Sequence, residues 1–134
     1  MKERILIVDD EPALRRTLER ALGSMGYDVV SVGDPHLAYE LLDAADYDLV
    51  VLDIHMPQMS GDTLAIALLR RWPKLIGRVL LMSGDPWALR ADWPEELRRC
   101  PLLVKPFTLD GLAAQVRATL TAPAPQAQRK RNGG

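Results

Sequence analysis

The sequence contains a single cysteine, Cys100, among its 134 residues. An intramolecular disulfide is therefore excluded, and such sparse cysteine usage fits a protein of a reducing compartment. No apolar run approaches the roughly 20 residues that a membrane-spanning helix requires. The charged start Met1–Arg4 leads into a short apolar segment that lacks the length and cleavage site of a signal peptide. We therefore expect a cytoplasmic protein without a membrane segment.

The sequence also has little net charge, −1 at neutral pH, which gives no reason to expect a nucleic-acid partner. Arg129, Lys130 and Arg131 lie in the last 14 residues, which contain no acid, whereas the other 120 residues carry 14 basic and 18 acidic side chains. Three basic residues in a tail can touch phosphates non-specifically, but nothing in the sequence supplies a helix that reads bases. We expect no direct nucleic-acid binding by this domain.

What the sequence does contain is a regular alternation of short apolar runs and amphipathic segments. Strands are expected at residues 4–8, 27–32, 47–53, 78–82 and 101–104. Helices are expected from Pro12, from Pro35, from about Gly61 to Trp72, after Asp85-Pro86 and from Thr108, with Asp10, Asp34, Asp85 and Thr108 as N-caps. The helix after Asp85 is expected to be poor, because Pro94 interrupts it. Five βα units predict an α/β domain with a parallel sheet and helices on both faces.

The alternation ends near residue 120, which gives the expected domain organisation. Residues 1–120 form one domain, and residues 121–134 alternate alanine and proline before the basic cluster. Because this stretch has no apolar stripe, we expect a disordered basic tail or linker there.

The stretch Tyr47–Gly61 is the one around which the rest of the chain is organised. A continuous apolar run, Leu49–Leu52, is typical of a strand buried on both faces, and it ends at Asp53. An aspartate at the carboxyl end of such a strand points into the crevice where open α/β sheets bind ligands. Taken alone, Asp53 is equally well explained as an ordinary strand-end residue.

Other chemically active side chains follow the remaining strands. Because the ends of parallel strands share one edge, the following residues are expected to converge: Asp9, Asp10, Asp53, Ser83 and Lys105. Clustered carboxylates with waters make a hard oxygen site that suits Mg²⁺. A carboxylate beside a metal ion and a lysine is able to accept a phosphoryl group. The sequence has no Walker P-loop and no G-x-G-x-x-G, so nucleotide binding has no support.

Four motifs, taken in order and spacing, carry a family resemblance: I-L-I-V-D-D-E-P, D-L-V-V-L-D-I-H-M-P-Q-M-S-G, V-L-L-M-S-G and V-K-P-F. Over residues 3–120 the chain resembles a bacterial response regulator receiver domain of two-component signal transduction. The resemblance implies a doubly wound, flavodoxin-like (βα)5 fold with strand order 2-1-3-4-5. It also implies a protein that catalyses only its own phosphorylation and dephosphorylation.

The resemblance further implies a role for each residue at the shared edge. Asp53 would be phosphorylated by a sensor histidine kinase or a phosphotransfer protein. Asp10, Asp53 and the backbone carbonyl of His55 would bind Mg²⁺ directly, and Asp9 would bind it through water. Ser83 would hydrogen-bond the phosphoryl group and Lys105 would pair with it. The peptide bond between Lys105 and Pro106 would be cis.

The sequence departs from the family pattern in the region after strand four. Leu102 stands where receivers commonly carry an aromatic that moves together with the serine, so the usual coupling to the output surface is not expected. The segment from Trp87 to Arg99, which follows Pro86, carries Pro94 and two tryptophans. Trp87 and Trp93 are interpreted either as half-buried packing or as exposed anchors for a partner.

Two further residues flank the predicted site. His55 and Asp85 lie two residues beyond Asp53 and Ser83. We hypothesise that they interact across the mouth of the site and affect the lifetime of the phosphoryl group. The alternative is an exposed histidine without a partner.

Three functions compete at this point. The first is a free-standing phosphoacceptor with an unidentified output partner. The second is a receiver taken from a longer protein, either a DNA-binding regulator or a hybrid histidine kinase. The third is a scaffold that works without phosphorylation, against which the intact set of site residues argues. The family also offers the face of helix four, strand five and helix five as a surface for a homodimer.

Overall fold

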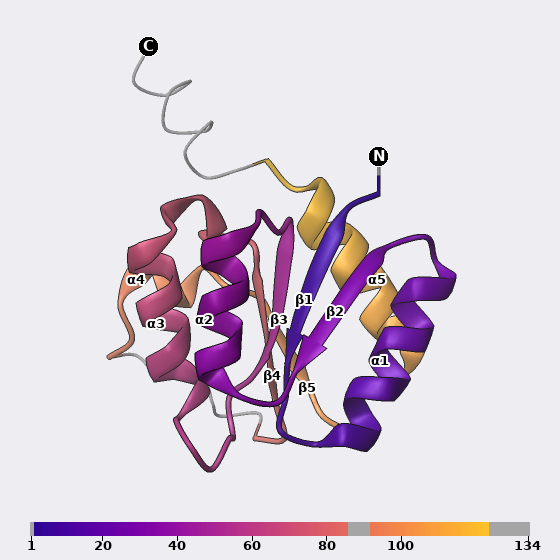
Figure 1. Cartoon of the computed structure of the whole chain (residues 1–134), viewed down its shortest axis with the longest axis horizontal. Helices are drawn as coiled ribbons and strands as arrows, with labels where there is room; N and C mark the ends of the chain where they lie inside the picture. The colour runs from indigo at the N-terminus through magenta and orange to yellow at the C-terminus, as the bar shows by residue number, and fades with distance from the viewer. Residues whose placement is uncertain (1, 86–91, 124–134) are drawn as a thin grey trace.

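Five parallel strands form one sheet in the order β2-β1-β3-β4-β5 in the computed structural model (Figure 1). Residues 2–85 and 92–123 are described. The strands are β1 (Arg4–Val8), β2 (Asp28–Val32), β3 (Leu49–Asp53), β4 (Val79–Ser83) and β5 (Leu102–Val104). The parallel sheet and the strand order expected from the family resemblance are thus confirmed.

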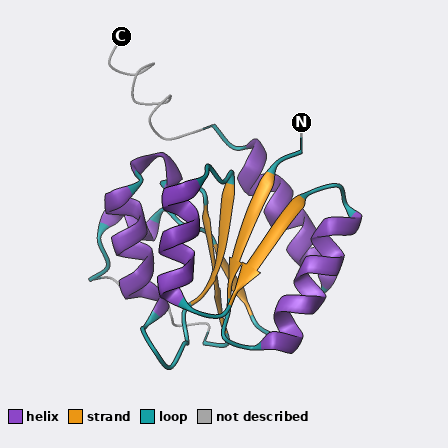
Figure 2. Cartoon of the chain, viewed as in Figure 1, coloured by secondary structure: helices purple, strands orange, loops and turns teal. Residues whose placement is uncertain are grey.

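The helices cover both faces of this sheet, as Figure 2 shows. They are α1 (Pro12–Ser24), α2 (Pro35–Ala44), α3 (Gly61–Arg71), α4 (Glu95–Arg98) and α5 (Leu109–Thr121), with a short 3-10 helix at Pro73–Leu75. Helices α1 and α5 pack on one face, and α2, α3 and α4 pack on the other. In the described part of the chain, none of the helices has the length and apolar character needed to cross a bilayer.

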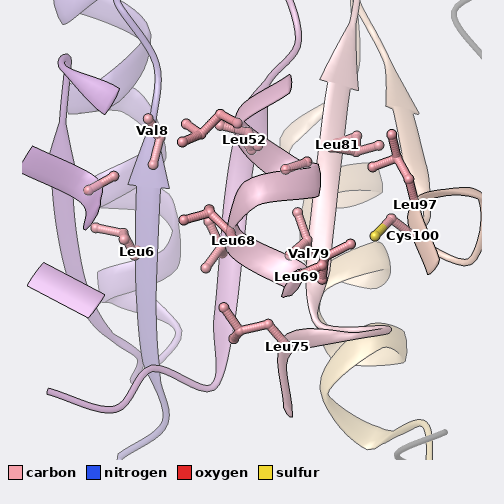
Figure 3. Packing of buried hydrophobic residues seen from close by; sticks show 14 of the residues in the cluster. Leu6, Val8, Leu52, Leu68, Leu69, Leu75, Val79, Leu81, Leu97 and Cys100 are labelled. Atoms are coloured by element: carbon pink, nitrogen blue, oxygen red, sulfur yellow. The ribbon is translucent and has the colours of Figure 1, made fainter. Parts of the chain in front are cut away.

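The central strands are buried on both sides, which explains their unbroken apolar runs. Along β3, Leu49 and Val51 join the cluster under α1 and α5, whereas Val50 and Leu52 join the cluster under α2, α3 and α4. Figure 3 shows part of the second cluster, where side chains from α3 meet those of β3 and β4. This two-sided packing fixes β3 in the middle of the sheet, with Asp53 at its end.

Two of the four expected helix caps are present, and the start of the helix that Asp85 would cap lies outside the described residues. The side chain of Asp34 accepts a hydrogen bond from the backbone N–H of His36, and the Thr108 hydroxyl accepts one from Gly111. The expected cap at Asp10 is wrong: Glu11 is the N-cap residue of α1, and it makes no side-chain cap. Instead, the carboxylate of Asp9 accepts the N–H of Glu11.

The region after β4 differs most from an ordinary βα unit. The only helical turn described there is α4, with four residues, and it begins directly after Pro94. Trp93 is 6% exposed and packs in the core, so the packing interpretation holds for it. Trp87 lies outside the described residues, as does the greater part of the expected tail.

Candidate functional site

Three carboxylates meet at the carboxyl edge of the sheet. Asp9 and Asp10 follow β1, and Asp53 is the last residue of β3. One oxygen from each of the three lies within 4.8 Å of the others. The convergence expected from strand direction is therefore present for all three acids.

Asp9 is fully buried, and its two carboxylate oxygens have different surroundings. Oδ1 accepts the N–H of Glu11 at 2.9 Å, whereas Oδ2 has no hydrogen-bond partner. Burial raises the pKa of Asp9; the hydrogen bond from Glu11 opposes this rise and the negative charge of Asp53 adds to it. A buried carboxylate oxygen without a partner is costly unless a cation satisfies it.

Asp53 is also buried, and backbone groups hold it in place. Its Oδ1 accepts the N–H of His55 at 3.1 Å. The carbonyl oxygen of the next residue, Ile54, accepts a hydrogen bond from the N–H of Gly61 at 2.7 Å. These bonds fold the β3–α3 loop back on itself, so that the Asp53 carboxylate faces the other acids.

One cation faces the two buried acids. The Lys105 ammonium nitrogen lies 3.8 Å from Asp9 Oδ2 and 3.6 Å from Asp53 Oδ2. The backbone N–H of Lys105 donates to the carbonyl of Ser83 at 2.7 Å, and the bond to Pro106 is cis. A single ammonium leaves the three-acid cluster with excess negative charge.

These donors fit a divalent cation. Mg²⁺ prefers oxygen ligands, takes one or two carboxylates and keeps several waters. The Asp9 oxygen without a hydrogen bond, the partly exposed Asp10 carboxylate and Asp53 supply such a set. The roles of Asp10 and of the His55 carbonyl as direct ligands remain predictions.

Ser83 ends β4 and is fully buried, with three polar neighbours around its hydroxyl. The N–H of Asp85 donates to the Ser83 oxygen at 3.0 Å, and the carbonyl of Asp85 lies 3.3 Å from it. The ring Nε2 of His55 lies 3.0 Å from the same oxygen. His55 and Asp85 therefore flank the site as hypothesised from the sequence, and both contact Ser83, a shared partner that the sequence did not indicate.

Sequence reasoning also missed Arg15. Its guanidinium donates to the backbone carbonyl of Asp9 at 2.6 Å. A Cβ at Gly33 would lie 2.5 Å from the Arg15 Nη1 atom, so the absence of a side chain at Gly33 leaves room for the arginine. Nothing in the spacing of these residues along the chain signals the contact.

A cavity of about 410 Å³ opens beside the site. Leu14, Lys105, Pro106 and Phe107 line it, so its walls come from α1 and from the segment between β5 and α5. The cavity is mostly apolar, and Lys105 is its one charged lining residue.

Residues 5–117 match the response regulator receiver domain family. The probable transcriptional regulator ycf27 of Porphyridium aerugineum is 34% identical over 119 residues, which cover 89% of this chain and 48% of that protein. The transcriptional regulatory protein TcrA of Mycobacterium tuberculosis is 35% identical over 115 residues, covering 86% of this chain and 45% of that protein. The chain thus spans about half the length of these curated relatives.

Solved structures show the same fold. Vibrio cholerae chemotaxis protein CheY4 superposes with a TM-score of 0.80 at 22% identity, covering 89% of this chain and 99% of that one. The response regulator TrrA of Thermotoga maritima, solved with Mg²⁺ and BeF, gives a TM-score of 0.74 at 29% identity over 87% of this chain and 98% of that one. TrrA in complex with the histidine kinase ThkA gives 0.73 at 28% identity, covering 89% of this chain and 99% of that one.

Proposed function

Because the chain belongs to the response regulator receiver domain family of two-component signalling, we propose that Asp53 is its phosphoacceptor. The observation that carries the proposal is the buried Asp53 carboxylate, which faces Lys105 at 3.6 Å and lies in a cluster with Asp9 and Asp10. Phosphoryl transfer depends mainly on positioning and on neutralising charge, and this cluster provides both.

The transfer follows from the groups present. A carboxylate oxygen of Asp53 attacks the phosphorus of a phosphohistidine, and an acyl phosphate bond forms as the P–N bond breaks. The electron pair stays on the donor imidazole, which takes up a proton. Hydrolysis then reverses the state: water attacks the phosphorus, Asp53 leaves as a carboxylate, and phosphate and a proton are released.

Each neighbour of Asp53 has a part in this proposal. Lys105 pairs with the transferred phosphoryl group, and the Ser83 hydroxyl donates a hydrogen bond to it. Asp10, Asp53 and the carbonyl of His55 would hold Mg²⁺ directly, with Asp9 acting through water. When bound, Mg²⁺ supplies the positive charge that neutralises and orients the phosphoryl oxygens.

The phosphodonor in this proposal is a sensor histidine kinase or a phosphotransfer protein. The complex of TrrA with the histidine kinase ThkA supports such a partner. The cavity lined by Leu14, Pro106 and Phe107 supports it as well, because an apolar surface beside Lys105 gives the donor protein a place to dock. Such a donor would meet this domain in the cytoplasm.

We propose that the output runs through the face of α4, β5 and α5, to a partner, an attached domain or a second copy. Val104 and Leu109 are large apolar residues exposed on this face. Leu102 is half-buried against the core, where an aliphatic side chain has no hydroxyl or ring to move with Ser83. A large switch in residues 85–105 is therefore not expected from phosphorylation alone.

Labelling with radioactive acetyl phosphate and Mg²⁺ tests the acceptor. We expect wild type to take up label at Asp53, Asp53→Asn to take up none, and Asp43→Asn, an exposed acid on α2, to label as wild type does. Equal labelling of the Asp53→Asn variant would overturn the assignment. Absence of labelling in wild type, also with a histidine kinase as donor, would instead favour a scaffold that works without phosphorylation.

A further inference from the structure

The Ser83 hydroxyl has more neighbours than it has protons to give. Its oxygen lies 3.0 Å from the N–H of Asp85, 3.3 Å from the carbonyl of Asp85 and 3.0 Å from Nε2 of His55. A serine hydroxyl donates one hydrogen bond and accepts two. Ser83 is fully buried, so protein groups surround its hydroxyl.

The chemistry of each neighbour assigns the direction of each bond. The Asp85 N–H can only donate, and the Asp85 carbonyl can only accept, so it takes the single proton of the hydroxyl. In this arrangement the remaining lone pair of Ser83 is left for a proton from His55, with hydrogen on Nε2 of the ring as the donor.

The same residue is tied to the proposed phosphoacceptor. The backbone N–H of His55 donates to Asp53 Oδ1 at 3.1 Å, while its exposed ring reaches the buried Ser83 hydroxyl on the neighbouring strand. His55 thus connects Asp53 at the end of β3 with Ser83 at the end of β4. These are the two side chains that the phosphoryl group would contact.

We propose that His55 is a positioning residue that orients the Ser83 hydroxyl for the phosphoryl group; this inference rests on the proposed function. The ring and the Asp85 N–H occupy the two lone pairs of the Ser83 hydroxyl. Its proton is then the group that is left to bond the phosphoryl group. The long 3.3 Å contact to the Asp85 carbonyl is the bond that a phosphoryl oxygen replaces. No other contact of Ser83 has to break.

A double-mutant cycle tests this arrangement. The probe is beryllofluoride with Mg²⁺, which mimics a phosphoryl group on a carboxylate, and its affinity is followed by ¹⁹F NMR. We expect His55→Ala to weaken binding by roughly three- to ten-fold, the worth of one hydrogen bond. In the Ser83→Ala background the same substitution should change affinity by less than about two-fold.

Two variants separate positioning from general damage to the fold. His55→Gln places an amide N–H near the position of Nε2 and should restore most of the affinity. His36→Ala, which removes the other histidine, exposed on α2, should bind as wild type does. Equal losses from His55→Ala with and without Ser83 would overturn the proposal, and so would failure of His55→Gln to bind better than His55→Ala.

A measurement without metal gives an independent check. ¹⁵N NMR of the neutral His55 ring should show a protonated Nε2, and this preference should weaken in Ser83→Ala. An unprotonated Nε2 in wild type would overturn the proposal. If wild type itself fails to bind beryllofluoride, the proposed function fails; if it binds and the cycle is additive, only the role of His55 fails.

Discussion

Gly61 lies so close to Asp53 that a Cβ on Gly61 would be 2.2 Å from the Asp53 carbonyl oxygen and 2.5 Å from the Cα of Ile54. Both contacts are with backbone, which cannot move aside as the end of a flexible side chain can. The start of α3 is therefore pressed directly against the segment that carries the proposed phosphoacceptor.

Gly61→Ala should consequently destabilise the fold by about 1–3 kcal/mol and reduce acetyl-phosphate labelling of Asp53. Gly23→Ala is the matched control, because a Cβ there meets nothing within 4 Å in the last turn of α1. That control should be stabilising by roughly 0.4–1 kcal/mol. Urea unfolding measures both, and equal effects of the two substitutions would contradict the close approach.

Asp9→Asn should stabilise the metal-free protein at neutral pH, by on the order of 1 kcal/mol, because a buried charge without a full set of partners is removed. The folded-state pKa of Asp9 is raised, so protonation favours the folded state below the ordinary pKa. That contribution is lost as the pH rises through the folded-state pKa. The advantage of the variant should therefore shrink on acidification, and thermal unfolding at pH 7 and at pH 3.5 measures this.

Mg²⁺ should make wild type more stable than Asp9→Asn, the reverse of their order without metal. A ligand that binds only the folded state at 100 times its dissociation constant stabilises it by about 2.7 kcal/mol. Wild type should gain this amount, and Asp9→Asn and Asp53→Asn should gain clearly less. Asp110→Asn, which alters an exposed acid on α5, should respond as wild type does. An equal response of all four proteins to Mg²⁺ would place the ion elsewhere.

The thiol of Cys100 should be unreactive in the folded protein. Burial raises its pKa to about 12, and the side chain is 2% exposed. At pH 8, Ellman's reagent should therefore react only as fast as the protein unfolds, and urea should restore full reactivity. Above pH 9 the thiol ionises in the unfolded state before it does so in the folded state, so the stability of wild type should fall as the pH rises. Cys100→Ala lacks the thiol and should not show this loss.

Arg78→Met should loosen the end of α5. The guanidinium donates to the backbone carbonyls of Thr119 and Ala122, which the helix itself leaves unpaired. We expect faster amide exchange in the last turn of α5 and a loss of about 1 kcal/mol of stability. Arg117→Met, on the exposed face of the same helix, is the comparison, and similar exchange in both variants would contradict the role of Arg78.

Local chemistry predicted most of the fold. The caps at Asp34 and Thr108 depend on side chains next to the helices they cap, so neighbouring residues were enough to predict them. The run Leu49–Leu52 is one of five short apolar runs that alternate with helical stripes, and this alternation favours a strand over a buried helix. The cap expected at Asp10 is wrong because an acid shortly before a proline gives the same local pattern in two cases. It can cap the helix, or it can join an acidic cluster at the strand end.

The contacts that sequence reasoning missed all depend on side-chain directions across the fold. The His55 ring reaches Ser83 because the β3–α3 loop turns toward β4, and Arg15 reaches Asp9 because Gly33 leaves space. Trp93 allows two interpretations from the sequence because spacing along the chain does not determine whether its ring joins the core, as it does in the fold.

The sheet order also has a consequence during synthesis. The acids lie at the ends of β1 and β3, but the ammonium that faces two of them follows β5, the last of the five strands to be made. A nascent chain that has left the ribosome only as far as Ser83 therefore holds Asp9, Asp10 and Asp53 without Lys105. Until residue 105 emerges, the repulsion within that edge is relieved without the Lys105 ammonium, by solvent cations and by Arg15 at the Asp9 carbonyl.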